Sequence, residues 1–163
     1  PGTAGGLPPF RLERDYTFEV KIVPRCTEKP ARFVLPVGRR FFHFQLNLGG
    51  DGGGRLVDTS EGQNERENSR SFSHDPFEVG QTYHLKVNVK IKESTAILTG
   101  EINDDEVIFW EGLITTLPAD AGKHTPREEG RLAYGSQDCS YEFHEAKVIV
   151  GRGGGWRLRP GGE

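Results

Sequence analysis

The stretch YHLKVNVKIK, residues 83–92, decides the fold class because its polarity alternates from one residue to the next. Leucine, valine and isoleucine occupy one set of alternate positions, and lysine and asparagine fill most of the other. A period of two places successive side chains on opposite faces of a β-strand, so the pattern predicts a strand with one buried face. The same alternation in YTFEVKIV, residues 16–23, predicts a second such strand.

Shorter segments of the same kind predict at least seven strands in total. They include RFVLPV (32–37), FFHFQLNL (41–48), TAILTGEI (95–102), VIFWEGL (107–113), GRLAYG (130–135) and CSYEFHEAKVIV (139–150). The turn NDDE, residues 103–106, predicts a hairpin. In the last segment the apolar positions change parity, which predicts a β-bulge near Glu145. No stretch has a helical period, so we expect an all-β, two-sheet antiparallel sandwich, a jelly roll, with almost no helix.

Gly- and Pro-rich segments flank the predicted strands. Residues 1–9 and 151–163 are expected to be tails around a single β-sandwich domain at residues 10–150. The chain begins at Pro1 and contains no methionine, so we expect it to be a piece of a longer protein. The longest turn-like segment, residues 49–81, holds only fragments of strand and is a candidate functional loop.

Charge and hydropathy argue against two classes of partner. The formal net charge is −3, and the lysines and arginines are scattered, so no basic stripe is offered to a nucleic acid. No apolar run approaches the roughly 20 residues that span a bilayer, so we expect no membrane insertion. A carbohydrate or a neighbouring protein domain is the expected partner.

Five segments carry a family resemblance: RFVLPVG, FHFQLNLGG, GQTYHLKVNVKI, GEINDDEVIFWEG and YEFHEAKVIVG. In strand order and turn pattern the chain resembles the concanavalin A-like lectin/glucanase superfamily, in its laminin-G-like branch near the 3-keto-disaccharide hydrolase-like domains. The resemblance covers residues 16–150 and implies two curved sheets, a concave outer face and a bias toward sugars. Glucanases of this superfamily carry paired acids as E-x-D-x-x-E on one strand, and no predicted strand here has that pattern.

A row of polar side chains on one predicted strand is the candidate ligand-binding site. If Phe42 and Phe44 enter the core, the period of two places His43, Gln45 and Asn47 on the outer face, about 7 Å apart. Amide and imidazole groups both donate and accept hydrogen bonds, as paired sugar hydroxyls require. An ordinary solvated strand face is the alternative. Trp110, beside the hairpin turn, is a candidate platform for a sugar ring, with a core position as its alternative.

Metal and catalytic sites have weaker support in the sequence. Calcium takes oxygen ligands, and loop residues that offer them are Asp51, Asp58, Asn103, Asp104 and Asp105, although turn formation explains them equally well. We therefore predict no cofactor, with Ca²⁺ as an alternative. Enzyme hypotheses have His43, His74, His144, Glu111 and Asp75 to draw on, but no spacing pairs an acid with a base.

The only two cysteines, Cys26 and Cys139, lie just beyond the first strand and at the start of the last. In laminin-G-like sandwiches these strands are antiparallel neighbours, so the resemblance allows Tyr16 to lie opposite Val150. In an antiparallel pair the two residue numbers have a constant sum, which is 166 for this register. The expected bulge near Glu145 lowers that sum by one, which places Cys26 opposite Cys139. A disulfide would argue for an oxidising compartment. Two buried free thiols are the alternative.

The sequence thus favours a non-catalytic carbohydrate-binding domain of a larger secreted or surface protein, in an extracellular, periplasmic or cell-surface location. The first alternative is a glycoside-acting hydrolase or lyase domain of the 3-keto-disaccharide hydrolase-like type. The second is a structural interaction domain in an assembly.

Overall fold

The structure is a computed structural model that describes residues 5–6, 14–48, 50–57, 69–119, 132–136, 141–151 and 154–157. Its strands are β1 (Gly5–Gly6), β2 (Tyr16–Pro24), β3 (Ala31–Val37), β4 (Arg40–Leu48), β5 (Gly53–Val57), β6 (Ser69–Ser73), β7 (Tyr83–Lys92), β8 (Thr95–Ile102), β9 (Asp105–Leu113), β10 (Ala133–Ser136), β11 (Tyr141–Val150) and β12 (Gly154–Arg157). One turn of 3₁₀ helix, η1 (Ile114–Thr116), follows β9.

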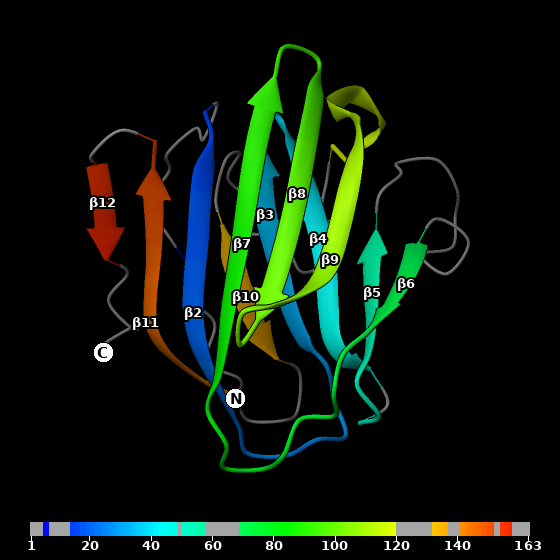
Figure 1. The fold of residues 1–163 in the computed structure, drawn as a ribbon, viewed down its shortest axis with the longest axis vertical. Helices are drawn as coiled ribbons and strands as arrows, with labels where there is room; N and C mark the ends of the chain where they lie inside the picture. The colour runs from blue at the N-terminus through cyan, green and yellow to red at the C-terminus, as the bar shows by residue number, and fades with distance from the viewer. Residues whose placement is uncertain are drawn as a thin grey trace.

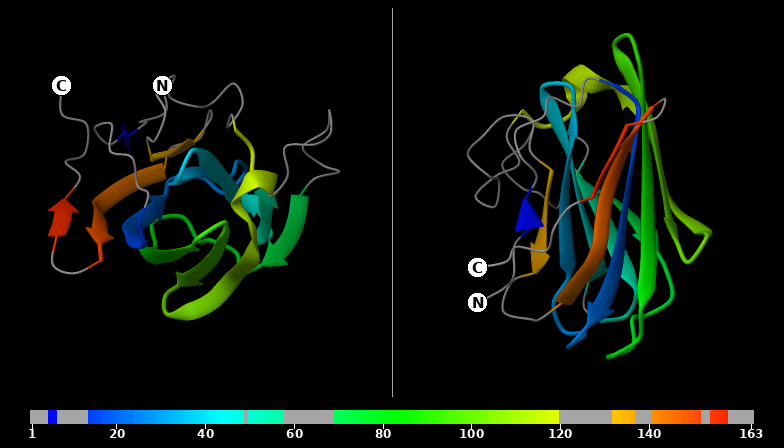
Figure 2. Two further views of the ribbon diagram at one scale, coloured as in Figure 1. Left: turned by 90° about the horizontal axis from the view of Figure 1, so that it is seen from above. Right: turned by 90° about the vertical axis from the view of Figure 1, so that its left-hand side faces the viewer.

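Two antiparallel sheets face each other and form a sandwich (Figures 1 and 2). Sheet A has the strand order β1-β10-β3-β4-β5-β6, and sheet B has the order β12-β11-β2-β7-β8-β9. The predicted all-β sandwich is therefore confirmed. Non-sequential neighbours in both sheets give the jelly-roll connectivity, because the chain crosses repeatedly from one sheet to the other.

The core lies between the sheets and follows the predicted alternation. Inward residues of β2 and β7, such as Phe18 and Val87, are fully buried. The Phe33 ring of sheet A stacks on that of Phe44 with centroids 4.9 Å apart, and it also lies 6.2 Å from the ring of Phe18 in sheet B. The Tyr16 hydroxyl donates a 2.8 Å hydrogen bond across the sandwich to the backbone oxygen of Pro36. Aromatic packing and this bond join the two sheets.

The register of β2 against β11 agrees with the sequence prediction. Tyr16 pairs with Val150, and the pairing shifts between His144 and Lys147, beside Glu145, which has a positive φ of 51°. A residue in the left-handed region is a normal component of a bulge. Beyond the shift Tyr141 pairs with Pro24, so both the starting pair and the bulge are confirmed.

The β8–β9 hairpin is also confirmed. Its turn residues Asn103 and Asp104 both have positive φ, 51° and 69°. Two consecutive left-handed residues form the turn type whose twist matches that of antiparallel strands, and Asn and Asp tolerate this conformation better than most residues.

The two expected tails, and the loop expected to hold only fragments of strand, contain strands. β5 and β6 lie within residues 49–81, and they extend sheet A beyond β4. The short strands β1 and β12 fall in the expected tails and pair with β10 and β11 at the sheet edges. Glycine hides the alternation on which strand prediction depends, which explains why β1 and β12 were missed. No helix among the described residues is both long enough and apolar enough to cross a membrane.

Candidate binding face

The outer face of sheet A is formed by alternate residues of β3, β4 and β5. Phe42 and Phe44 of β4 belong to the central core, so the intervening His43 and Gln45 point to the opposite side of the sheet. The predicted orientation of these two residues is correct, but their predicted exposure is not. Each side chain is only 4% exposed.

A small apolar cluster explains part of this burial. Val34 and Phe41 are buried outside the central core, and Val34 pairs with His43 across β3 and β4. The Phe41 N–H donates to the backbone oxygen of Pro118, which brings the segment after η1 against the start of β4. The outer face of sheet A therefore carries buried side chains at this end and is not a simple solvated surface.

Asn47 does not belong to this outer face, which corrects the sequence prediction. Its φ is 59°, so the backbone leaves the extended conformation and the period of two ends before it. The side chain is fully buried. Its Nδ2 donates to the Thr27 backbone oxygen at 3.2 Å, and its Oδ1 accepts from the Phe77 N–H at 3.4 Å. Asn47 is therefore a structural link between β4 and two loops.

Trp110 is also excluded from the site. Its side chain is 2% exposed and meets the ring of Phe42 edge-on, with centroids 4.6 Å apart. The inward parity of β9 places it between the sheets, where the indole contributes packing area. The core alternative given for this residue is correct, and Trp110 cannot stack on a sugar in this conformation.

The structure adds two arginines that sequence reasoning missed. Arg32 of β3, Gln45 of β4 and Arg55 of β5 are directly paired across three neighbouring strands. We call these three residues the Arg–Gln–Arg row. Both arginines are partly exposed, whereas Gln45 is buried. With strands about 4.8 Å apart, the row spans roughly 10 Å. The alternation of Arg32 with core residues was visible in the sequence RFVLPV. The pairing of β3, β4 and β5 was not.

Chemically, the Arg–Gln–Arg row is rich in hydrogen-bond donors. Each guanidinium offers a planar set of N–H groups, and the amide of Gln45 can both donate and accept. Such a row is suited to oxygen-rich ligands with hydroxyl or carboxylate groups. No acidic side chain occupies an outward position of β3 or β4, or of the described part of β5 at residues 53–56.

His74 anchors the loop before β7. Its Nε2 accepts the Asn47 N–H at 3.1 Å, so the proton resides on Nδ1, which donates to the Asp75 backbone oxygen at 2.7 Å. The imidazole also lies on the ring of Phe77, with centroids 4.7 Å apart. Burial lowers the pKa of His74 from its ordinary value of 6.5, although Asp75 and Asp51 oppose that effect. The neutral ring is the form that fits.

We expect the free energy of unfolding to fall as the pH drops below about 6.5. The pKa of His74 is lower in the folded chain than in the unfolded chain. At a pH between these two pKa values, unfolding therefore takes up a proton. Protonation also removes the lone pair that accepts the Asn47 N–H. Urea unfolding at pH 7.5 and at pH 5.5 measures the difference in the free energy of unfolding between the two pH values. We expect this difference to be smaller in His74→Leu and unchanged in the surface variant His84→Asn. An unchanged difference in His74→Leu would contradict this role.

Of the residues proposed as calcium ligands, two bind backbone N–H groups, Asp104 lies in the β8–β9 turn, and Asp105 begins β9. Asp51 Oδ1 accepts the Gly53 N–H, and Asn103 Oδ1 accepts the His84 N–H. Asp58 lies outside the described residues. Within the described ranges no three acidic, histidine or cysteine side chains gather closely enough to hold a metal.

The residues considered for an enzyme are dispersed. His43 lies on the outer face of sheet A, Glu111 on edge strand β9 and His74 in the loop before β7. His144 Nε2 lies 3.1 Å from Glu142 on β11, both at the surface.

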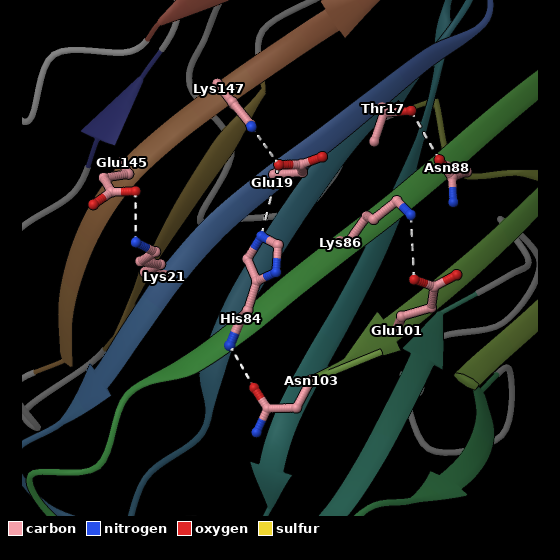
Figure 3. Close-up of polar contacts among 10 residues, drawn as sticks. All are labelled: Thr17, Glu19, Lys21, His84, Lys86, Asn88, Glu101, Asn103, Glu145 and Lys147. Carbon is pink, nitrogen blue, oxygen red and sulfur yellow. Dashed lines mark hydrogen bonds and ion pairs between the residues drawn. The ribbon is translucent and has the colours of Figure 1, made fainter. Parts of the chain in front are cut away.

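The outer face of sheet B carries a ladder of ion pairs (Figure 3). Glu19 contacts Lys147 at 2.6 Å on one side and His84 at 3.6 Å on the other. A further pair joins Lys86 to Glu101 at 3.4 Å. The Lys86–Glu101 pair is partly exposed to solvent and contributes little stability, whereas the Glu19 side chain is only 14% exposed. The opposite charges of these pairs neutralise the middle of this sheet face.

The predicted disulfide rests on the pairing of β2 with β11, which is described only as far as Tyr141 and Pro24. Cys26 is partly buried and packs against the central core. The numbers of Tyr141 and Pro24 sum to 165, which is the sum expected for the predicted pair Cys26 and Cys139. Cys139 lies outside the described residues, so the bridge stays a prediction.

Comparisons with solved structures place the fold. Galectin LEC-6 from Caenorhabditis elegans matches with a TM-score of 0.53 and 14% identity, over 88% of this chain and 89% of that one. A tetrameric galectin from the ball sponge Cinachyrella matches with a TM-score of 0.51 and 12% identity, over 92% of this chain and 99% of that one. No protein-family model and no curated protein matches the chain. The likeness shows the concanavalin A-like lectin/glucanase fold.

Proposed function

We propose that this concanavalin A-like sandwich is a non-catalytic carbohydrate-binding domain whose ligand contacts the Arg–Gln–Arg row. The observation that carries the proposal is the pairing of Arg32, Gln45 and Arg55 across three adjacent strands of one sheet face. The superfamily's bias toward sugars supports the ligand class. The donor groups of the row match the hydroxyl oxygens of a glycan.

We infer different parts in ligand binding for the residues of this face from their burial. The partly exposed arginines make the first contacts, and the buried Gln45 and His43 shape the floor beneath them. A guanidinium also binds carboxylate or sulfate oxygens in a planar, two-pronged manner, so acidic sugars fit the row better than neutral ones. The proposal therefore keeps two of the sequence-predicted residues and replaces Asn47 and Trp110 with the two arginines.

We further propose that the domain works outside the cytosol, in an extracellular, periplasmic or cell-surface setting. The support is the Cys26–Cys139 pairing expected from the strand register. Structural disulfides persist in oxidising compartments.

Glycan-array binding tests the function. We expect the domain to bind one or more glycans, and Arg32→Ala and Arg55→Ala each to weaken affinity about tenfold, because a hydrogen bond to a charged donor is lost. Arg39→Ala is the matched control, since Arg39 is exposed on the β3–β4 turn and lies away from the row. Its affinity should equal that of the unmodified domain.

Two other outcomes would overturn the proposal in distinct ways. Turnover of an oxidised or plain disaccharide would favour the hydrolase or lyase alternative. Absence of both binding and turnover would favour a structural interaction domain.

A further inference from the structure

The free edge of β9 combines exposed apolar side chains with acidic side chains that form no ion pair within the described residues. β9 is the last strand of sheet B and pairs only with β8 within the described residues. Figure 1 shows it at the side of the front sheet. On its solvent face Phe109 is 59% exposed and Leu113 is 50% exposed. These two side chains lie four residues apart on the same face of the strand, and exposed apolar surface of this kind favours an interaction.

The charges on this strand are all acidic. Asp105, Glu106 and Glu111 are exposed, and Asp104 precedes them in the turn. No ion pair in the described part of the chain involves any of these four carboxylates, in contrast to the paired charges in the middle of sheet B. No lysine, arginine or proline lies in β9. An edge strand without proline or lysine leaves its backbone N–H and C=O groups available for another strand.

The alternation of side chains along β9 predicts which residue types a strand added at this edge would carry. Phe109, Glu111 and Leu113 share the solvent face, because Ile108 and Trp110 are buried on the other. Cross-strand neighbours on one face contact each other directly. A complementary strand therefore carries an apolar residue, then a basic residue, then an apolar residue at alternate positions.

A second copy of this chain is a poor occupant of the same edge. Pairing β9 with itself would bring two sets of carboxylates together with no cation among them. Like charges in cross-strand positions are destabilising. The acidic side chains thus disfavour self-association and favour a basic partner.

We propose that the free edge of β9 binds an extended peptide segment with the alternating pattern apolar, basic, apolar, which adds to sheet B as a further strand. Backbone hydrogen bonds supply affinity in this mode, and alternate side chains supply specificity. The surface is separate from the Arg–Gln–Arg row, because it lies on the other sheet.

A pair of synthetic peptides tests the proposal by calorimetric titration of the whole chain. The first peptide has Thr at every second position, and Val, Lys, Val and Lys, in that order, at the positions between. The second peptide is the same except that Glu replaces both Lys. We expect saturable binding of the Lys peptide and about tenfold weaker binding of the Glu peptide. Glu111→Lys should reverse that preference, and Phe109→Thr should weaken both peptides about fivefold.

Matched controls separate the edge from general surface effects. Ile149→Thr removes an exposed apolar side chain from β11, and Glu78→Lys reverses an exposed charge in a loop. Neither should change peptide binding. Equal affinity for both peptides, no saturable binding, or an unchanged preference in Glu111→Lys would overturn the proposal. Loss of self-association in Phe109→Thr without peptide would show instead that the edge joins two copies.

Discussion

Asn47→Leu should destabilise the domain by about 4 kcal/mol. The change leaves the Thr27 carbonyl and the Phe77 N–H without their buried partner, and each such loss costs about 1–3 kcal/mol. Leucine must also adopt a φ of 59°, which costs about 1 kcal/mol more. Urea unfolding followed by circular dichroism gives the free energy of unfolding of both proteins.

Asn47→Gly separates the two contributions. Glycine accepts a positive φ without strain but makes neither side-chain hydrogen bond, so its loss should be smaller than that of leucine by about 1 kcal/mol. A loss below about 0.5 kcal/mol in both variants would show that Asn47 does not connect β4 to the loops that contain Thr27 and Phe77.

Reduction of the Cys26–Cys139 bridge should lower the free energy of unfolding by about 4 kcal/mol. The bridge would close most of the chain into one loop, which restricts the unfolded state, and long loops give the largest effect. Unfolding with and without reductant measures the change, and the variant in which both cysteines are replaced by serine should match the reduced protein. Mass measurement after alkylation is the direct check: two labels on the unreduced, denatured protein would refute the bridge.

Strand pattern and turn chemistry were sufficient to predict much of the fold. The alternation in β2 and β7 placed the core, and Asn103 and Asp104 placed the β8–β9 turn. The change of parity in the last strand located the bulge beside Glu145. These features are local, so neighbouring residues alone encode them. The strands of the glycine-rich segments carry no such signal, and only their pairing partners reveal them.

The candidate site was predicted less well, for physical reasons. Asn47 does not lie on its predicted face, because its positive φ ends the alternation of β4. The sequence does not reveal the φ of a single residue. Residues 107–110 are all apolar, so the sequence alternation did not decide which face of the strand carries Trp110. Arg32 and Arg55 become neighbours of Gln45 only through the register of three strands, which is a property of the assembled sheet.

The most direct test is a residue-by-residue map of glycan binding on the whole domain. Backbone amide shifts can be recorded by NMR while an array-positive glycan is titrated. We expect the largest shifts on β3, β4 and β5, centred on Arg32, Gln45 and Arg55, and no comparable change on the outer face of sheet B. Shifts centred on β2, β7 and β8 instead, with the Arg–Gln–Arg row unmoved at saturation, would contradict the proposed site.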